Sequence, residues 1–451
     1  MSPDPAQQRR SPAPAPQPRR RTDGTRRVLK AMFGPFWVIP ALSSAAAFFV
    51  GILAPELDQR VAEYVPFLFT AGTDGARTML STIAGAMISL TGLVFSITIV
   101  VLQLASSQFS PRVLSTFLDE RVPQVTLGVF TASFIYSLTV LRAVSGSVEG
   151  TTTEVPQIAV SLAFLLVLAS VGMFLAFIHH ITESISVEVI VQTVGSETRE
   201  LLEGSRAEAS LDESSGAGHA GSGAADGEDS DDRVTGRTQV VLTDSNGYLN
   251  YVDAAGLVAA AAKADARVEM LHPLGTFLVA DQPLATLHPL GRDQQGRPRE
   301  QDHDAVRSAT SITSRRSMEQ DVTFGLRQLV DIAERALSPG VNDPTTAVQV
   351  LNELHTILRL IAVRPDVGTA HADDDGMVRL LTCEWTFEQY LDLCIDEIAH
   401  WGESSIQVPR RVEQMLTQLE VNAHAQHRES IVAKAGSLRA ARLRKVAAEQ
   451  Q

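Results

Sequence analysis

The stretch LSTIAGAMISLTGLVFSITIVVLQL, residues 80–104, decides the fold of this chain, because no Asp, Glu, Lys, Arg or His interrupts it. About 20 apolar residues make a helix long enough to cross the hydrocarbon core of a bilayer. The bilayer interior offers a bare backbone no hydrogen-bond partner, so a segment of this length has to cross as a helix rather than as an open strand. The stretch therefore predicts a membrane-spanning helix.

Three further apolar runs lie in the N-terminal half of the 451-residue chain. Together the runs predict four spans, at about 36–54, 78–104, 122–142 and 156–180, within a transmembrane domain of residues 31–202. A signal peptide is the rival interpretation of the first run, but that run is longer than the usual apolar region of such peptides. Four spans bring both termini to one side of the membrane.

The orientation follows from the arginine-rich first residues. Residues 1–30 are rich in Pro, Ala, Gln and Arg, cannot bury a core, and are predicted to be a disordered basic arm. Positive charge favours the cytoplasmic side, whereas the segment between the first two spans has more acidic than basic residues. We therefore expect a multi-pass protein of the cell membrane, in contact with lipid and with both termini in the cytoplasm.

One face of the second span differs from the rest of that helix. Small or hydroxylated residues recur there at alternating steps of three and four, and beyond Ile99 the face becomes polar. Two interpretations stay open: close packing against another helix, which small residues permit, or the lining of a water or ion path. A path between four-helix subunits requires an oligomer, so a homo-oligomer is expected. The face consists of Thr78, Thr82, Gly85, Ser89, Gly92, Ser96, Gln103 and Ser106.

The second half of the chain is charged and carries most of the formal net charge of −14. This acidity argues against nucleic acid as a partner. Cys383 and Cys394 offer neither a disulfide framework nor zinc-type spacing. Residues 203–237 are a mixture of Gly, Ser, Ala and carboxylates, and are predicted to be a disordered acidic linker without the Lys and flanking elements of a phosphate-binding loop.

Short β-like runs fill residues 238–300, which predict a small β-rich module. Asn246-Gly247 separates the first two runs and predicts a hairpin there. A short alanine-rich helix is expected at 253–263. The phrase from Leu274 to Leu287 resembles the small barrel-sandwich modules of the biotinyl and lipoyl type. Because Lys263 lies on the helix and not at a hairpin tip, no covalent cofactor is expected.

Residues 301–425 read as a helical subdomain, followed by a charged, solvated helix or tail at 426–451. An apolar stripe predicts a helix that ends near residue 337, and a second helix is predicted from Pro344, with Asp343 capping its free amides. The fold class is therefore α+β, with a four-helix transmembrane domain before a cytoplasmic β-rich module and helical subdomain. The connection between these two helices is a candidate structural loop of Ser338, Pro339, Gly340, Asn342, Asp343 and Pro344.

Several phrases resemble a family of predicted bacterial multi-pass membrane proteins known as domain of unknown function 2254. The resemblance runs from about residue 36 to 421 and implies location and topology, but no activity. It departs at the basic arm and at the linker. The phrases are FWVIPAL at 36–42, LSTIAGAMISLTGLVFSITIVVLQLASSQFSPR at 80–112, LGVF at 127–130, FIHH at 177–180 and EQDVTFGLRQLVDIAERALSPGVNDPTTA at 319–347.

No nucleotide-binding loop, dinucleotide fingerprint, zinc-protease helix or nucleophile elbow is present in the sequence. Asp321 with Arg327, and His355 with His371, lack the spacing of a catalytic or metal site. His179 and His180 are expected to be an interfacial pair rather than a metal site.

We therefore expect a non-enzyme without cofactors. Two functions stay open: a channel-like or transport-related oligomer with a cytoplasmic regulatory domain, or a membrane-anchored scaffold or sensor that binds an unknown partner through its cytoplasmic half. No acidic or basic residue lies in the middle of a predicted span, which argues against a proton-coupled pump.

Overall fold

The computed structural model describes residues 36–61, 72–108, 121–145, 156–184, 186–215, 237–291, 302–366 and 370–449. The chain forms two compact units, the first of which ends at Thr182. The predicted basic arm, residues 1–30, lies outside the described residues, and so does most of the predicted acidic linker.

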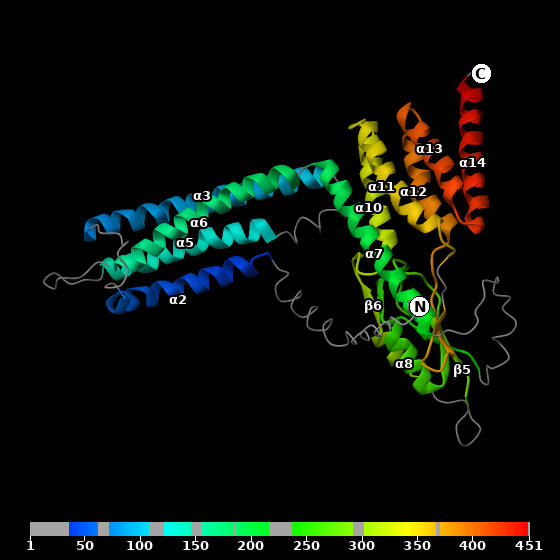
Figure 1. The fold of residues 1–451 in the computed structure, drawn as a ribbon, viewed down its shortest axis with the longest axis horizontal. Coiled ribbons are helices and arrows are strands. Elements are labelled where there is room, and N and C mark those ends of the chain that lie inside the picture. The colour runs from blue at the N-terminus through cyan, green and yellow to red at the C-terminus, as the bar shows by residue number, and fades with distance from the viewer. Residues whose placement is uncertain are drawn as a thin grey trace, which may run out of the picture. The chain divides into compact units, whose positions relative to one another are not determined.

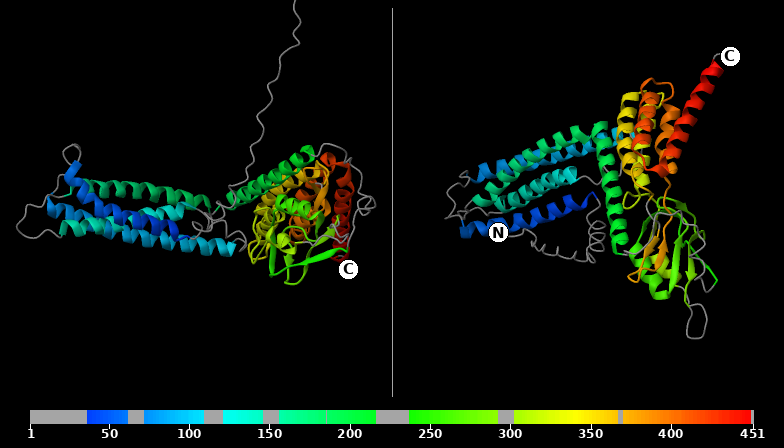
Figure 2. Two further views of the ribbon diagram at one scale, coloured as in Figure 1. Left: turned by 90° about the horizontal axis from the view of Figure 1, so that it is seen from below. Right: turned by 45° about the vertical axis from the view of Figure 1, so that its right-hand side comes forward.

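The described residues of the first unit form a bundle of four helices that run lengthwise beside one another (Figure 1; Figure 2). By length and composition, three of them could cross a membrane, with apolar stretches at Thr73–Gln103, Arg121–Val144 and Gln157–Glu183. The described apolar stretch of the remaining helix, Val38–Ala54, is shorter. The four helices are α2 (Val38–Val61), α3 (Thr73–Gln108), α5 (Arg121–Ser145) and α6 (Gln157–Ser184).

Helices α2 and α5 pack closely and run parallel. A Cβ added to Gly51 would lie 2.9 Å from Thr139 Cβ, and one added to Gly128 would lie 2.9 Å from Ser43 Oγ. Small residues allow this close approach of two helix backbones.

Polar contacts join α5 to α6 in the interior of the bundle. Ser133 Oγ and Ser170 Oγ lie 3.1 Å apart, and Tyr136 donates its hydroxyl hydrogen to the carbonyl oxygen of Ala159 at 2.9 Å. The higher-numbered residue of α5 thus meets the lower-numbered residue of α6, so these two helices are antiparallel.

The second unit begins with α7 (Val187–Ser215) and contains two β-sheets around one apolar core. The five-stranded sheet has the order β1-β5-β3-β8-β7, in which only the β3 and β8 pair is parallel. The three-stranded sheet has the order β4-β2-β6. The strands are β1 (Gln239–Leu242), β2 (Gly247–Val252), β3 (Ala266–Met270), β4 (Phe277–Leu278), β5 (Pro283–Pro289), β6 (Thr310–Thr313), β7 (Ala370–Ala372) and β8 (Val378–Leu381).

The hairpin predicted at Asn246-Gly247 is wrong. β1 pairs with β5, whereas β2 pairs with β4 and β6, so the chain changes sheets at this turn. Asn246 accepts a hydrogen bond from the Ala280 amide through its side-chain oxygen, and the Thr243 amide donates to Gln282. The turn is therefore bound to the β4–β5 connection instead of closing a hairpin.

The sequence predicted a β-rich module at 238–300 and a helical subdomain at 301–425. The structure differs, because three strands lie beyond residue 300. β6 follows a short helix α9 (His303–Ser308), and β7 and β8 follow two long helices. A parallel partner such as β8 needs a long crossover connection, which hides the pairing from any local reading of the sequence. The predicted alanine-rich helix is confirmed as α8 (Ala254–Ala264), with Asp253 as its cap.

Five more helices lie in the described part of the second unit. Their apolar stripes are buried, as amphipathic helices of a globular domain require, and α10 is buried on its polar side as well, at Gln328 and Asp331. They are α10 (Val322–Leu337), α11 (Pro344–Ala362), α12 (Phe387–Trp401), α13 (Gln407–Asn422) and α14 (Ala425–Glu449).

Two helices differ from the expectations. α7 continues to Ser215, into the region predicted to be linker from residue 203, where Leu, Glu, Arg and Ala are good helix formers. α14 is not solvated all round: Ile431 is buried, and Lys434 pairs with Asp392 and with Asp396 of α12.

Candidate functional site

The unusual face of α3 points away from the other helices of its own bundle. Thr82, Gly85, Ser89, Gly92 and Ser96 are all exposed, and nothing lies within 4 Å of a Cβ added to Gly85 or Gly92. Gln103 is exposed as well, while the side chain of Ser106 lies outside the described residues.

The buried face of α3 is the opposite, bulky one, and includes Leu80, Met87 and Val94. Packing of the small residues against another helix, one of the two interpretations from the sequence, is therefore not realised among the described helices of the same chain, because large apolar side chains fill the space between α3 and those helices.

Two hydroxyl groups on the exposed face, those of Thr82 and Ser89, already have partners in their own helix. Thr82 donates to the Thr78 carbonyl oxygen at 2.7 Å, and Ser89 donates to the Gly85 carbonyl oxygen at 2.9 Å. Each hydroxyl oxygen keeps a lone pair as an acceptor. The face can thus tolerate an apolar neighbour and can also accept a hydrogen bond from a partner helix or from water.

A second polar group lies inside the bundle, on α5. Ser137 is buried, and among the described residues its hydroxyl has no hydrogen-bond partner, one helical turn from the Ser133 and Ser170 pair. Ser133 and Ser170 each donate to a carbonyl oxygen of their own helix. The sequence of a helix by itself does not reveal which of its sides faces the bundle.

In the second unit, a buried carboxylate joins the β-strands to α10. Asp321 is 1% exposed, accepts from the amide of Phe324 at 3.1 Å as the cap of α10, and accepts from Arg316 Nη2 at 2.6 Å. Gly275, at φ 83°, lies against both side chains, and a Cβ there would collide with Arg316 Nη2. The charge of Asp321 is thereby compensated in the interior, where an unpaired carboxylate would be very costly.

Asp321 and Arg327, singled out together in the sequence, are not partners. Arg327 forms ion pairs with Asp331 at 2.7 Å, with Glu334 at 3.0 Å and with Glu397. Burial, followed by the charge of Glu397, raises the pKa of Glu334. Three carboxylates around one guanidinium hold α10 against α12, which is a structural role.

The loop before α11 has the predicted structure. Asp343 accepts from the amides of Thr345 at 3.1 Å and Thr346 at 3.2 Å, and Pro344 occupies the first turn of α11. Asn342 adopts φ 50°, which turns the chain between the two helices. Within the described residues, the loop is accounted for by caps and turns.

The remaining chemically reactive side chains are dispersed. No group of three or more His, Cys, Asp or Glu side chains in the described part of the chain could hold a metal ion. Burial raises the pKa of both Cys383 and Cys394, so the neutral thiols predominate near pH 7. Arg411 Nη2 donates a hydrogen bond to Nδ1 of His355 at 3.0 Å. The pKa of His355 is lowered by burial and, to a smaller extent, by the positive charge of Arg411.

Apolar helices long enough to cross a membrane, followed by a mixed α/β unit, define the class: a predicted membrane protein with a large extramembrane part. The chain belongs to the family described as "Predicted membrane protein (DUF2254)", which matches residues 34–418. The resemblance stated from the sequence is thereby confirmed.

Two curated relatives are mycobacterial. The uncharacterized protein Rv1290c of Mycobacterium tuberculosis and the uncharacterized protein Mb1321c of Mycobacterium bovis are each 29% identical over 397 residues, which cover 88% of this chain and 73% of the relative. No solved structure matches the chain.

Proposed function

We propose that this chain is a subunit of a channel-like or transport-related homo-oligomer in the cell membrane, and that its second unit is a cytoplasmic regulatory domain. The observation that carries the proposal is the outward direction of the small and hydroxylated face of α3. The other side of α3 is already packed inside its own bundle.

Lipid is a poor match for this face. Helix α6 exposes large apolar side chains such as Leu165, Leu168 and Leu175, as a lipid-facing helix should. Helix α3 also exposes large apolar side chains such as Phe95 and Val100, but beside them it exposes Gly85, Gly92 and the hydroxyls between these glycines. In a bilayer, small residues favour helix association because backbones approach closely and hydroxyls bond across the contact. A second copy of α3 supplies the matching surface, and several copies around an axis would line a path with hydroxyl groups.

The proposal includes a fourth span. α2 has 24 residues, about 36 Å at 1.5 Å per residue, and packs along α5, which is itself long and apolar enough to cross. Helix α2 runs parallel to α5, and α5 runs antiparallel to α6. These directions are those of an up-down-up-down bundle. With four spans, the basic arm places both termini in the cytoplasm.

The regulatory role of the second unit is supported by α7. This helix begins at Val187, directly after α6 ends at Ser184, and it packs on α10 and α11. Arg199 of α7 forms an ion pair with Glu353, and Thr198 lies against Gly325, where a Cβ would collide with its hydroxyl. A ligand that shifts α10 or α11 would move α7, the helix that follows α6 in the chain.

The alternative is a membrane-anchored scaffold or sensor that binds a partner without conduction. It is favoured by the turn between α12 and α13, where Ile406 is 85% exposed and Trp401 is 48% exposed. Exposed large apolar side chains that lie close together mark protein-binding surfaces.

The decisive experiment combines mass determination of the detergent-purified protein with ion flux in liposomes. We expect a defined oligomer and flux for the unchanged protein. Gly85→Leu with Gly92→Leu should give monomers without flux, because leucines at both positions prevent close backbone contact. Gly172→Leu on α6 is the matched control, since nothing lies within 4 Å of a Cβ there either, and it should leave both properties unchanged.

The outcomes separate the two functions. An intact oligomer in the double leucine variant would show that α3 is not the interface. An unchanged protein that is oligomeric in liposomes but passes none of the ions tested would favour the scaffold.

A further inference from the structure

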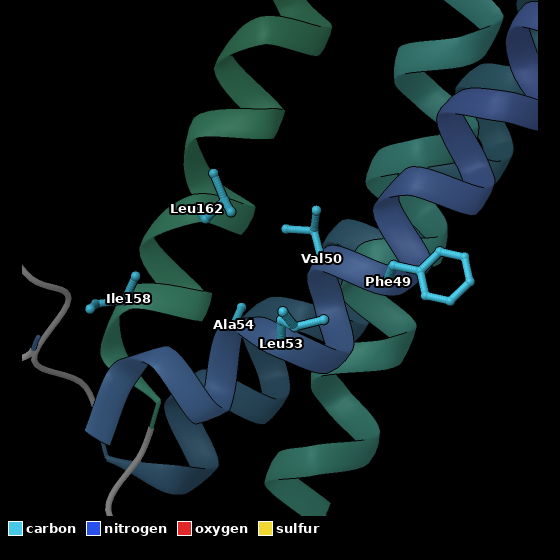
Figure 3. A pocket seen from close by; sticks show the side chains of 6 residues that line it. All are labelled: Phe49, Val50, Leu53, Ala54, Ile158 and Leu162. Atoms are coloured by element: carbon cyan, nitrogen blue, oxygen red, sulfur yellow. The ribbon is translucent and has the colours of Figure 1, made fainter. Parts of the chain in front are cut away.

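The surface of the first unit has an apolar groove between α2 and α6, with a volume of about 390 Å³. Figure 3 shows lining residues on both helices, with Val50 of α2 and Leu162 of α6 across the gap from each other. Its lining is wholly apolar and consists of Phe49, Val50, Leu53, Ala54, Ile158 and Leu162.

We infer that this groove binds one acyl chain of a membrane lipid. The inference rests on the proposed crossing of the membrane by α2. At the level of the groove the surrounding medium is then hydrocarbon, so an unfilled apolar gap would lose dispersion contacts that an acyl chain restores.

The side chains that line the groove differ in size and exposure, which suits a thin acyl chain. Phe49 and Leu53 are 62% and 51% exposed, whereas Ala54 is only 4% exposed. The groove is therefore bounded by bulky side chains above a small one, and α2 cannot move toward α6 to close it without leaving α5. The close contacts of Gly51 with Thr139 hold α2 on α5.

A helix of a second copy fits this groove poorly. The stretch Phe49–Ala54 is about 8 Å long at 1.5 Å per residue, which is shorter than the 10 to 12 Å diameter of a helix with its side chains. Apart from the buried Ala54, the lining also lacks the small residues that let helices approach in a bilayer. A flexible, unbranched hydrocarbon chain is narrow enough to enter.

The position of the groove also leaves room for a lipid headgroup. Ala54 is two residues before Glu56 on α2, and Ile158 directly follows Gln157, the first residue of α6. Both walls thus reach polar residues within one turn, near the membrane edge. A chain in the groove keeps its headgroup in the polar layer.

The test is native mass spectrometry of the full-length protein, purified in mild detergent from membranes. We expect one phospholipid per chain to remain bound to the unchanged protein. Leu162→Trp, which fills the groove from α6, should reduce this bound fraction at least fivefold. Leu175→Trp is the matched control on the same helix, at a position that is 65% exposed and outside the groove, and it should retain the lipid.

A second variant and a crosslinker remove the remaining ambiguities. Val50→Trp fills the groove from α2 and should have the same effect if Leu162→Trp fails to fold. Benzoylphenylalanine incorporated at Phe49 should form adducts with lipid after illumination in nanodiscs. Crosslinked dimers from this position, or lipid retention that Leu162→Trp and Leu175→Trp affect equally, would overturn the inference.

The failure of the proposed membrane crossing gives a different result. In that case position 49 would form no lipid adducts at all, while benzoylphenylalanine at Leu175 of α6 would still form them.

Discussion

Two glycines in the second unit share a positive φ but differ in their surroundings. Gly275 has φ 83° and lies against Arg316 and Asp321, whereas Gly376 has φ 77° and nothing within 4 Å of an added Cβ. Both positions favour glycine, because other residues are strained in the left-handed region. Only at Gly275 would an added Cβ also collide with neighbouring side chains.

We predict that Gly275→Ala destabilises the second unit more than Gly376→Ala. Each variant incurs a backbone cost of about 1 kcal/mol or more. Gly275→Ala also displaces Arg316 from the buried carboxylate of Asp321. The measurement is thermal unfolding of the full-length protein, followed by the fluorescence of Trp385 and Trp401. Equal shifts of the midpoint in the two variants would show that the Arg316 contact is unimportant for stability.

Asp343 provides a prediction with a pH dependence. Asp343→Ala should lower the local stability of the first turn of α11 by about 1 kcal/mol, the usual value of a helix cap. Amide hydrogen exchange at Thr345 and Thr346 measures this loss, and Asp304→Ala, on the separate helix α9, should leave it unchanged.

The hydrogen bond from the Thr346 hydroxyl lowers the pKa of Asp343. A carboxyl whose pKa is lower in the folded state stabilises that state above its unfolded pKa of about 3.9. This contribution is lost as the pH falls through the folded pKa. Protection of the turn should therefore weaken below about pH 4 in the unchanged protein, and the Asp343→Ala variant should lack this step.

At the scale of elements, glycines serve two purposes in the first unit. Gly51 and Gly128 lie in the tight contact of α2 with α5, while Gly85 and Gly92 lie on the open face of α3. Each sits in an apolar helix, and the sequence pattern around them is similar. The two pairs of glycines differ only in whether another helix of the same bundle packs against them.

Gly128→Leu should destabilise the individual subunit, because the leucine would collide with Ser43 of α2. Overpacking of this kind costs about 1 to 3 kcal/mol. Unfolding of the detergent-solubilised monomer by SDS, followed by circular dichroism, measures the change. Gly85→Leu should leave the unfolding of the monomer unchanged, and a similar loss in both variants would contradict the proposed division of roles.

At the scale of the whole molecule, the proposed topology predicts the location of the C-terminus. A green fluorescent protein fused after Gln451 should fluoresce, and alkaline phosphatase fused at the same point should be inactive, because the former folds in the cytoplasm and the latter in the periplasm. The reverse pattern would require an odd number of spans or the opposite orientation.

Much of the architecture could be predicted from the sequence, because local patterns carry it. An uninterrupted apolar run has to be a helix in a bilayer, and local patterns predicted α10 and α11 with the turn and the Asp343 cap between them. The cap at Asp343 was predictable because its partners lie within three residues.

Only the tertiary structure decided features that depend on distant segments. The pairing of β1 with β5 instead of β2, the parallel pairing of β3 with β8, and the ion pair of Arg199 with Glu353 depend on how the chain returns to itself. The direction in which the small-residue face of α3 points is another feature that only the tertiary structure decides. The spacing of Thr82, Gly85 and Ser89 shows that they share one side of a helix, but the bulkier Leu80, Met87 and Val94 occupy the interior because only they fill the space between the helices.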